Sequence, residues 1–124
     1  MSTLKVNTIQ NTSGVEVYTT KAWVSFNGTG TISILSSGNV SSITDLGVGQ
    51  YQVNFATALP ANYAFTGMTG IGTNGAIYMT GARSQGVDGI RTTTECSFGT
   101  GAAHASGIGM TQYDATYVSA QFIA

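Results

Sequence analysis

The sequence contains very little charge. Asp, Glu, Lys and Arg make up 7% of its 124 residues, against roughly 25% in an ordinary soluble domain. The formal net charge is −1, and the four basic residues are scattered along the chain: Lys5, Lys21, Arg83 and Arg91. Nucleic acid and anionic membrane surfaces both require clustered Lys and Arg. We therefore expect neither of them as a partner.

Residues suited to disulfides and metal sites are also scarce. Cys96 is the single cysteine, so it cannot form an intrachain disulfide; we interpret it as a small buried hydrophobic residue. His104 is the single histidine, and the two together supply at most two soft ligands where a structural zinc site needs four. The sequence predicts no metal and no cofactor.

Long apolar runs are missing too. None approaches the roughly 20 residues of a membrane-spanning helix. The opening MSTLKVNTIQ lacks the basic region and apolar core of a signal peptide. We therefore expect synthesis in a cytoplasm and no membrane insertion.

One glycine pattern, GIGTNG at residues 70–75, has the G-x-G-x-x-G spacing of a dinucleotide-binding turn. That spacing binds phosphate only where a helix follows the glycines and an acidic residue about 20 positions later binds the ribose. Here the alternation of Ile77 and Met79 indicates a strand after the glycines, and no suitably placed acidic residue ends a second strand. We interpret the pattern as a turn between strands.

Strand patterns dominate what is present. In QYQVNF, Tyr51, Val53 and Phe55 alternate with polar residues, as in a half-buried antiparallel strand. The preceding SSITDLG is expected to pair with it across a glycine-bearing turn at residues 47–49. KAWVSF and TISIL predict a second hairpin, whose turn uses the Asn-Gly pair at residues 27–28.

Two later segments alternate as well. IRTTTECSF, residues 90–98, is expected to be one strand with Arg91 and Glu95 on its solvated face. YVSAQFIA, residues 117–124, predicts a terminal strand. Four aromatic residues lie within strand patterns, and we interpret them as core: Trp23, Phe26, Tyr51 and Phe55.

Together these patterns predict an all-β fold, an antiparallel β-sandwich, preceded by a short extended leader at residues 1–20. The sandwich is expected over 21–124. Within it, 21–66 carries dense strands, 67–116 carries glycine-rich loops and strands, and 117–124 is the terminal strand.

Binding residues are expected in the glycine-rich stretch, because loops on a rigid scaffold often carry function. Aromatic rings at loop tips, beside amide and hydroxyl groups, suit sugar rings. The candidate receptor-binding residues are Tyr78, Arg83, His104 and Tyr113.

Catalysis is not expected. No G-x-S-x-G nucleophile turn occurs. A pair of carboxylates for glycoside hydrolysis would have to come from a small set whose spacing in sequence does not give their distance in space: Glu16, Asp45, Asp88, Glu95 and Asp114. A polysaccharide depolymerase therefore remains an alternative without a supporting motif.

The stretch from residue 21 to 65 resembles a segment that recurs in tail fibre and related virion proteins of tailed bacteriophages, including cyanophages. The shared features are KAWVSFNGTG, then NVSSITD, then GVGQYQVNF, then a proline, Pro60, and NYA. The opening STLKVNTI, followed by SGV, looks like the leader that often precedes that segment. These matches cover about half of the chain.

The resemblance implies a homotrimeric virion protein. It would be held to other tail or capsid proteins through residues 1–20 and would contact a host surface glycan through its C-terminal part. A tail fibre-like or tail-tip component involved in host attachment is the function it implies. A capsid decoration protein without receptor binding is the alternative. A cellular lectin outside any virus fits the leader less well.

Overall fold

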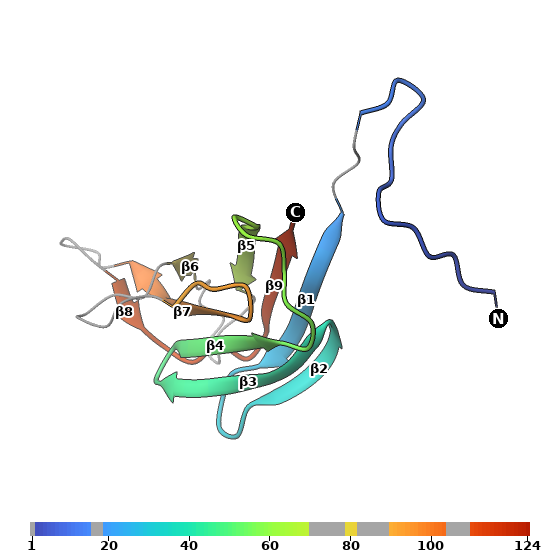
Figure 1. The fold of residues 1–124 in the computed structure, drawn as a ribbon. Helices are drawn as coiled ribbons and strands as arrows, with labels where there is room; N and C mark the ends of the chain where they lie inside the picture. Colours follow the sequence, from blue (N-terminus) through green and yellow to red (C-terminus); the bar gives the residue numbers. More distant parts are fainter. Residues whose placement is uncertain (1, 16–18, 70–78, 82–89, 104–109) are drawn as a thin grey trace.

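The computed structural model describes residues 2–15, 19–69, 79–81, 90–103 and 110–124. Within these residues the chain forms nine β-strands and no helix (Figure 1). The strands are β1 Thr20–Asn27, β2 Ser33–Gly38, β3 Val40–Gly47, β4 Gln50–Phe55, β5 Ala64–Thr69, β6 Met79–Gly81, β7 Glu95–Ala103, β8 Met110–Gln112 and β9 Val118–Ile123.

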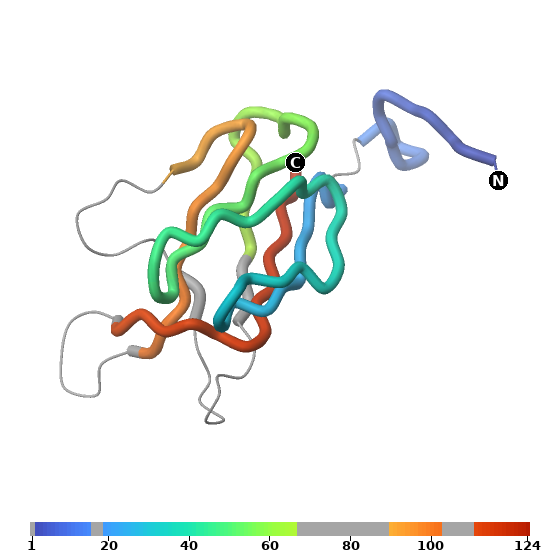
Figure 2. Tube along the Cα trace, turned by 90° about the horizontal axis from the view of Figure 1, so that it is seen from below, coloured from blue at the N-terminus to red at the C-terminus, as the bar shows by residue number. Residues whose placement is uncertain are grey.

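The strands form two antiparallel sheets, seen from a second direction in Figure 2. One has the order β2-β1-β9-β5; the other has the order β3-β4-β7-β6, with β8 also paired to β7. The predicted all-β antiparallel class is confirmed. Side chains from both sheets enter one apolar core, an arrangement consistent with a sandwich.

The core lies between the two sheets because alternate residues of each strand point inward. Phe122 of β9 is fully buried, with its ring centroid 4.8 Å from that of Phe55 and 5.2 Å from that of Phe65. A second aromatic group joins Phe26, Tyr51 and Phe98 at centroid separations of 5.1 to 6.3 Å. Edge-to-face and offset ring contacts of this kind add to the free energy gained by burial.

Both predicted hairpins are present. β3 and β4 pair across Val48 and Gly49, and Gly49 has a φ of 64°, which favours glycine. β1 and β2 also pair, but their connection over residues 28–32 is longer than the predicted Asn-Gly turn, and the positive φ falls at Gly30. Gly28 is needed for packing instead: a Cβ there would overlap the Tyr51 hydroxyl.

The expected strand over residues 90–98 is wrong at its start, since β7 begins at Glu95. The Thr92 hydroxyl accepts hydrogen bonds from the backbone N–H groups of Thr94 and Glu95, at 3.2 and 3.1 Å. A threonine that binds the backbone in this way closes a turn in place of extending a strand. The chain before the turn therefore runs back along β7, with Arg91 bridged to Cys96.

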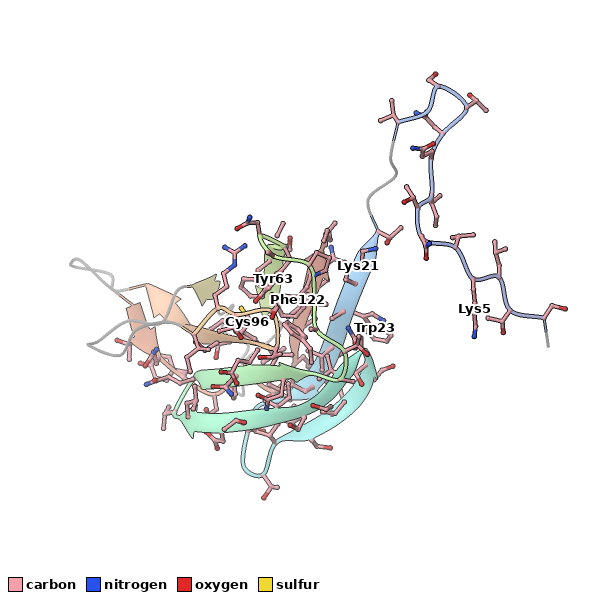
Figure 3. All side chains as sticks on the ribbon, in the orientation of Figure 1. Lys5, Lys21, Trp23, Tyr63, Cys96 and Phe122 are labelled. Atoms are coloured by element: carbon pink, nitrogen blue, oxygen red, sulfur yellow. The ribbon has the colours of Figure 1, made fainter. Side chains whose placement is uncertain are left out.

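The prediction that Trp23 belongs to the core is also wrong. Phe26, Tyr51 and Phe55 are buried as expected, but Trp23 is 41% exposed. In β1 the inward positions belong to Ala22, Val24 and Phe26, so the period-two alternation turns Trp23 to the outer face. Figure 3 shows Trp23 apart from Tyr63, Cys96 and Phe122, which gather between the sheets.

Residues 2–15 are exposed and contain no strand. The Asn11 side-chain oxygen accepts hydrogen bonds from the N–H groups of Ser13 and Val15, which closes a local turn. Figure 1 shows this segment leading away from the sheets. Its larger apolar side chains are exposed, with Leu4 at 86%.

Candidate functional site

A hollow of about 530 Å³ lies on the outer face of the four-stranded sheet. This volume falls within the roughly 300 to 1,000 Å³ of small-molecule sites. We call it the Trp23 hollow. It is lined by Thr20, Trp23, Val24, Ser25, Thr66, Ser119, Ala120 and Gln121.

Strand register brings these residues together from three distant parts of the sequence. Trp23 on β1 lies opposite Gln121 on β9, and Gln121 lies opposite Thr66 on β5. In the next row of outward-facing residues, Ser25 lies opposite Ser119. Because residues directly opposite on neighbouring strands share a face, their side chains form one continuous patch.

The Trp23 ring is positioned by a glycine on the neighbouring strand. Gly38 of β2 lies directly opposite Trp23. A Cβ at Gly38 would overlap the indole nitrogen, so the indole rests on the bare backbone there. Gly38 does not have a positive φ. Glycine is therefore required there for space, because any side chain would meet the indole.

The described lining of the Trp23 hollow carries polar groups on a largely apolar surface, and it is uncharged. The described lining residues supply hydroxyl groups, one amide and one indole, and none of them is acidic or basic. Within the described part of the chain, the side chains of Ser25, Thr66 and Gln121 form no hydrogen bond to the protein. The amide of Gln121 supplies both a donor and an acceptor. The hollow is therefore suited to a neutral ligand that carries hydroxyl groups.

Three of the four predicted receptor-binding residues, Tyr78, Arg83 and His104, lie outside the described residues, as does the GIGTNG turn. Tyr113 is described and is 43% exposed. Its backbone N–H donates to the Thr100 carbonyl at 3.0 Å, and its carbonyl accepts from the Thr100 hydroxyl at 2.7 Å. It does not line the Trp23 hollow.

Sequence reasoning missed Trp23 as a site residue although the signal was present. KAWVSF alternates, and a strand that buries Ala22, Val24 and Phe26 must present Trp23 on its other face. Gln121 had the same signal in the predicted terminal strand. The fact that these two residues lie side by side follows from the pairing of β1 with β9, which the sequence does not reveal.

A smaller hollow of about 310 Å³ lies beside Tyr63 and Arg91. The Arg91 guanidinium lies 5.0 Å from the centre of the Tyr63 ring and also donates a hydrogen bond to the Tyr63 carbonyl. Nearby Cys96 is 3% exposed, which confirms its predicted burial. Burial raises the pKa of the Cys96 thiol, which keeps it protonated and unreactive at neutral pH.

The described acidic residues act as hydrogen-bond acceptors for their own chain. The Asp114 carboxylate accepts from the Gly49 N–H at 2.7 Å and lies 3.1 Å from the Tyr51 hydroxyl. Burial, and then the charge of Asp114, raises the pKa of Tyr51 above its ordinary value. Glu95 accepts from the Gln52 amide at 2.9 Å, and Asp45 accepts from the Gly47 N–H at 3.0 Å.

Glu16 and Asp88, the other two carboxylates considered for catalysis, lie outside the described residues. Among the residues that are described, no three His, Cys, Asp or Glu side chains form a group able to hold a metal ion. The same residues include no helix of the length and hydropathy needed to span a membrane.

Comparisons of this chain with protein-family models, with curated proteins and with solved structures found no match.

Proposed function

We propose that this chain is a structural protein of a tailed-phage virion, a tail fibre-like or tail-tip component that attaches to the host by non-covalent binding of a surface glycan. The observation that carries the attachment role is the Trp23 hollow. It places an exposed aromatic ring among uncharged hydroxyl and amide groups on rigid strands. The resemblance of residues 21–65 to tail fibre segments supports the virion assignment.

The proposed assembly is a homotrimer, held to other virion proteins through residues 1–20. Leu4, Val6 and Ile9 in that segment are exposed and would gain free energy by burial against a partner. Three copies in each trimer, and several trimers on each virion, would convert weak single-site binding into firm attachment.

Localisation and adsorption together test the function. We expect antibody against the purified protein to label the tail of the virion in electron micrographs. We also expect a phage carrying Trp23→Ala to adsorb to host cells more weakly than its parent. Labelling of the capsid, with adsorption intact after deletion of the gene, would favour the decoration protein instead.

A solution mass measurement tests the oligomeric part. Light scattering of the purified chain is expected to give three times the 12.7 kDa mass of one copy. A stable monomer would contradict the trimer, and it would leave the tail label and the adsorption assay to decide the attachment role.

A further inference from the structure

We propose that the Trp23 hollow binds one uncharged pyranose ring, stacked on the indole of Trp23 and hydrogen-bonded to the amide of Gln121. This inference rests on the proposed function, because it names the ligand class of the same surface. It also assigns the binding to residues of β1, β5 and β9, away from Tyr113.

Stacking is the first step of the argument. One face of a pyranose ring presents C–H groups, and the π face of an indole carries partial negative charge that attracts them. Trp23 is 41% exposed, yet its ring is seated on the bare backbone at Gly38. An aromatic ring that is already fixed loses little conformational entropy when a ligand binds.

Hydrogen bonding is the second step. Gln121 lies directly opposite Trp23 in the sheet, so its side chain lies beside the indole on the same face. An amide offers a donor and an acceptor side by side, which matches two neighbouring sugar hydroxyls. Thr66 lies beyond Gln121 in the same row and Ser25 lies in the next row, so both add hydroxyl groups to this face.

Charge decides which sugars fit. A carboxylate that leaves water needs a compensating cation or several strong donors. Among the described residues that line the Trp23 hollow there is no Lys, Arg or His. Neutral hexosides are therefore expected to bind, and uronic acids are expected to bind much more weakly.

The experiment uses the purified full chain and four probes: the methyl glycosides of glucose, galactose and mannose, and methyl glucuronide. Trp23 is the single tryptophan, so the indole N–H signal in an NMR spectrum reports this site alone. We expect a saturable shift of that signal with at least one neutral glycoside at concentrations up to about 50 mM, as for a weak single-site ligand. The glucuronide is expected to cause no saturable shift.

Variants connect the binding to the residues. Gln121→Ala is expected to weaken binding by about tenfold, the effect of losing two hydrogen bonds. Trp23→Ala, followed through the Gln121 side-chain amide signal, is expected to abolish it. Tyr113→Ala removes an equally exposed aromatic residue outside the hollow and is expected to change nothing. If Trp23→Ala fails to fold, Gln121→Ala still tests the site.

Several results would overturn the inference. They are the absence of a shift with all three neutral glycosides, equal binding of the glucuronide, and loss of binding in Tyr113→Ala but not in Gln121→Ala. A Trp23→Ala variant that changes the solution mass of the protein, without any sugar binding in the parent, would identify the hollow as a subunit contact. Sugar binding without any label on virions would leave this inference intact and would contradict the proposed function.

Discussion

The two faces of the four-stranded sheet differ although the same strands build them. On β1, the inner face carries Ala22, Val24 and Phe26, all buried against the second sheet. The outer face carries Trp23 and Ser25 and has no covering layer among the described residues (Figure 3). A substitution at one position should therefore change stability, and a substitution at its neighbour should change binding.

The adjacent pair Phe122 and Gln121 on β9 gives the strongest test of that difference. Phe122→Ala removes a fully buried ring that contacts Phe55, Tyr63 and Phe65. We expect it to lower the free energy of unfolding by about 3 to 5 kcal/mol. Gln121→Ala, one residue away on the outer face, is expected to stay within about 0.5 kcal/mol of the parent.

Urea unfolding followed by far-ultraviolet circular dichroism measures both variants. A loss at Gln121 comparable to that at Phe122 would mean that the outer face is also packed in solution, as it would be in a subunit interface. In that case the difference between the two faces would not hold for the assembled protein.

A partly buried polar contact joins the Asp114 carboxylate to Gly49 and Tyr51, and its removal should have the next largest effect. Asp114→Ala would leave the Gly49 N–H without its acceptor and would leave the Tyr51 hydroxyl with the Gly28 carbonyl alone. We expect a loss of about 1 to 3 kcal/mol, because a buried donor left without a partner, here the Gly49 N–H, is costly. Asp45→Ala, which removes an exposed acceptor from a turn, is the matched control and should cost less. Equal losses would show that burial of the Asp114 contact contributes nothing.

The dependence of stability on alkaline pH tests the burial of Tyr51. Burial raises the pKa of Tyr51 in the folded protein, whereas an unfolded tyrosine ionises near its ordinary pKa of about 10. Above that pH the folded state keeps a proton that the unfolded state loses, so stability falls as pH rises. Tyr51 is expected to contribute a slope of about 1.4 kcal/mol for each pH unit.

Urea unfolding at a series of pH values from 8 upward measures this slope. Tyr51→Phe should be less stable at neutral pH, because it loses a hydrogen bond, but its stability should fall less steeply above pH 10. An unchanged slope in that variant would mean that Tyr51 ionises in the folded state as readily as it does in the unfolded state.

Local patterns were enough to predict the fold class and much of the core. The alternation of Tyr51, Val53 and Phe55 gave the strand and its buried face, because a strand has only two faces. The turn at Thr92 was missed, since residues 90–98 also alternate and a side-chain hydrogen bond decided between turn and strand. An alternation of residue types does not report a side-chain hydrogen bond of this kind.

The candidate site was predicted poorly for a different reason. Trp23 was assigned to the core by residue type, whereas its position in the alternation places it outside. Its neighbours Gln121 and Thr66 are about 98 and 43 positions away in sequence, and only the pairing of β1, β9 and β5 brings them together. Pairing of distant strands is a property of the whole fold, which no local pattern contains.

Gly38→Ala is expected to have a small effect on stability and a clear effect on the outer face. The added Cβ would overlap the indole nitrogen of Trp23. The displaced indole is the end of an exposed side chain and can rotate away without disturbing the core, so we expect a change of less than about 1 kcal/mol. Its displacement should shift the tryptophan fluorescence maximum, which this residue alone produces.

A matched substitution separates the packing role of Gly38 from its backbone role. Gly30→Ala also replaces a glycine in the β1–β2 hairpin, but at a positive φ of 61° with no atom near the new Cβ. It should therefore strain the backbone and lower stability without moving the Trp23 emission. If Gly38→Ala leaves both the emission and the Trp23 indole N–H signal unchanged, the indole does not rest on β2 in solution. The outer face would then lack the fixed ring on which the stacking of a sugar depends.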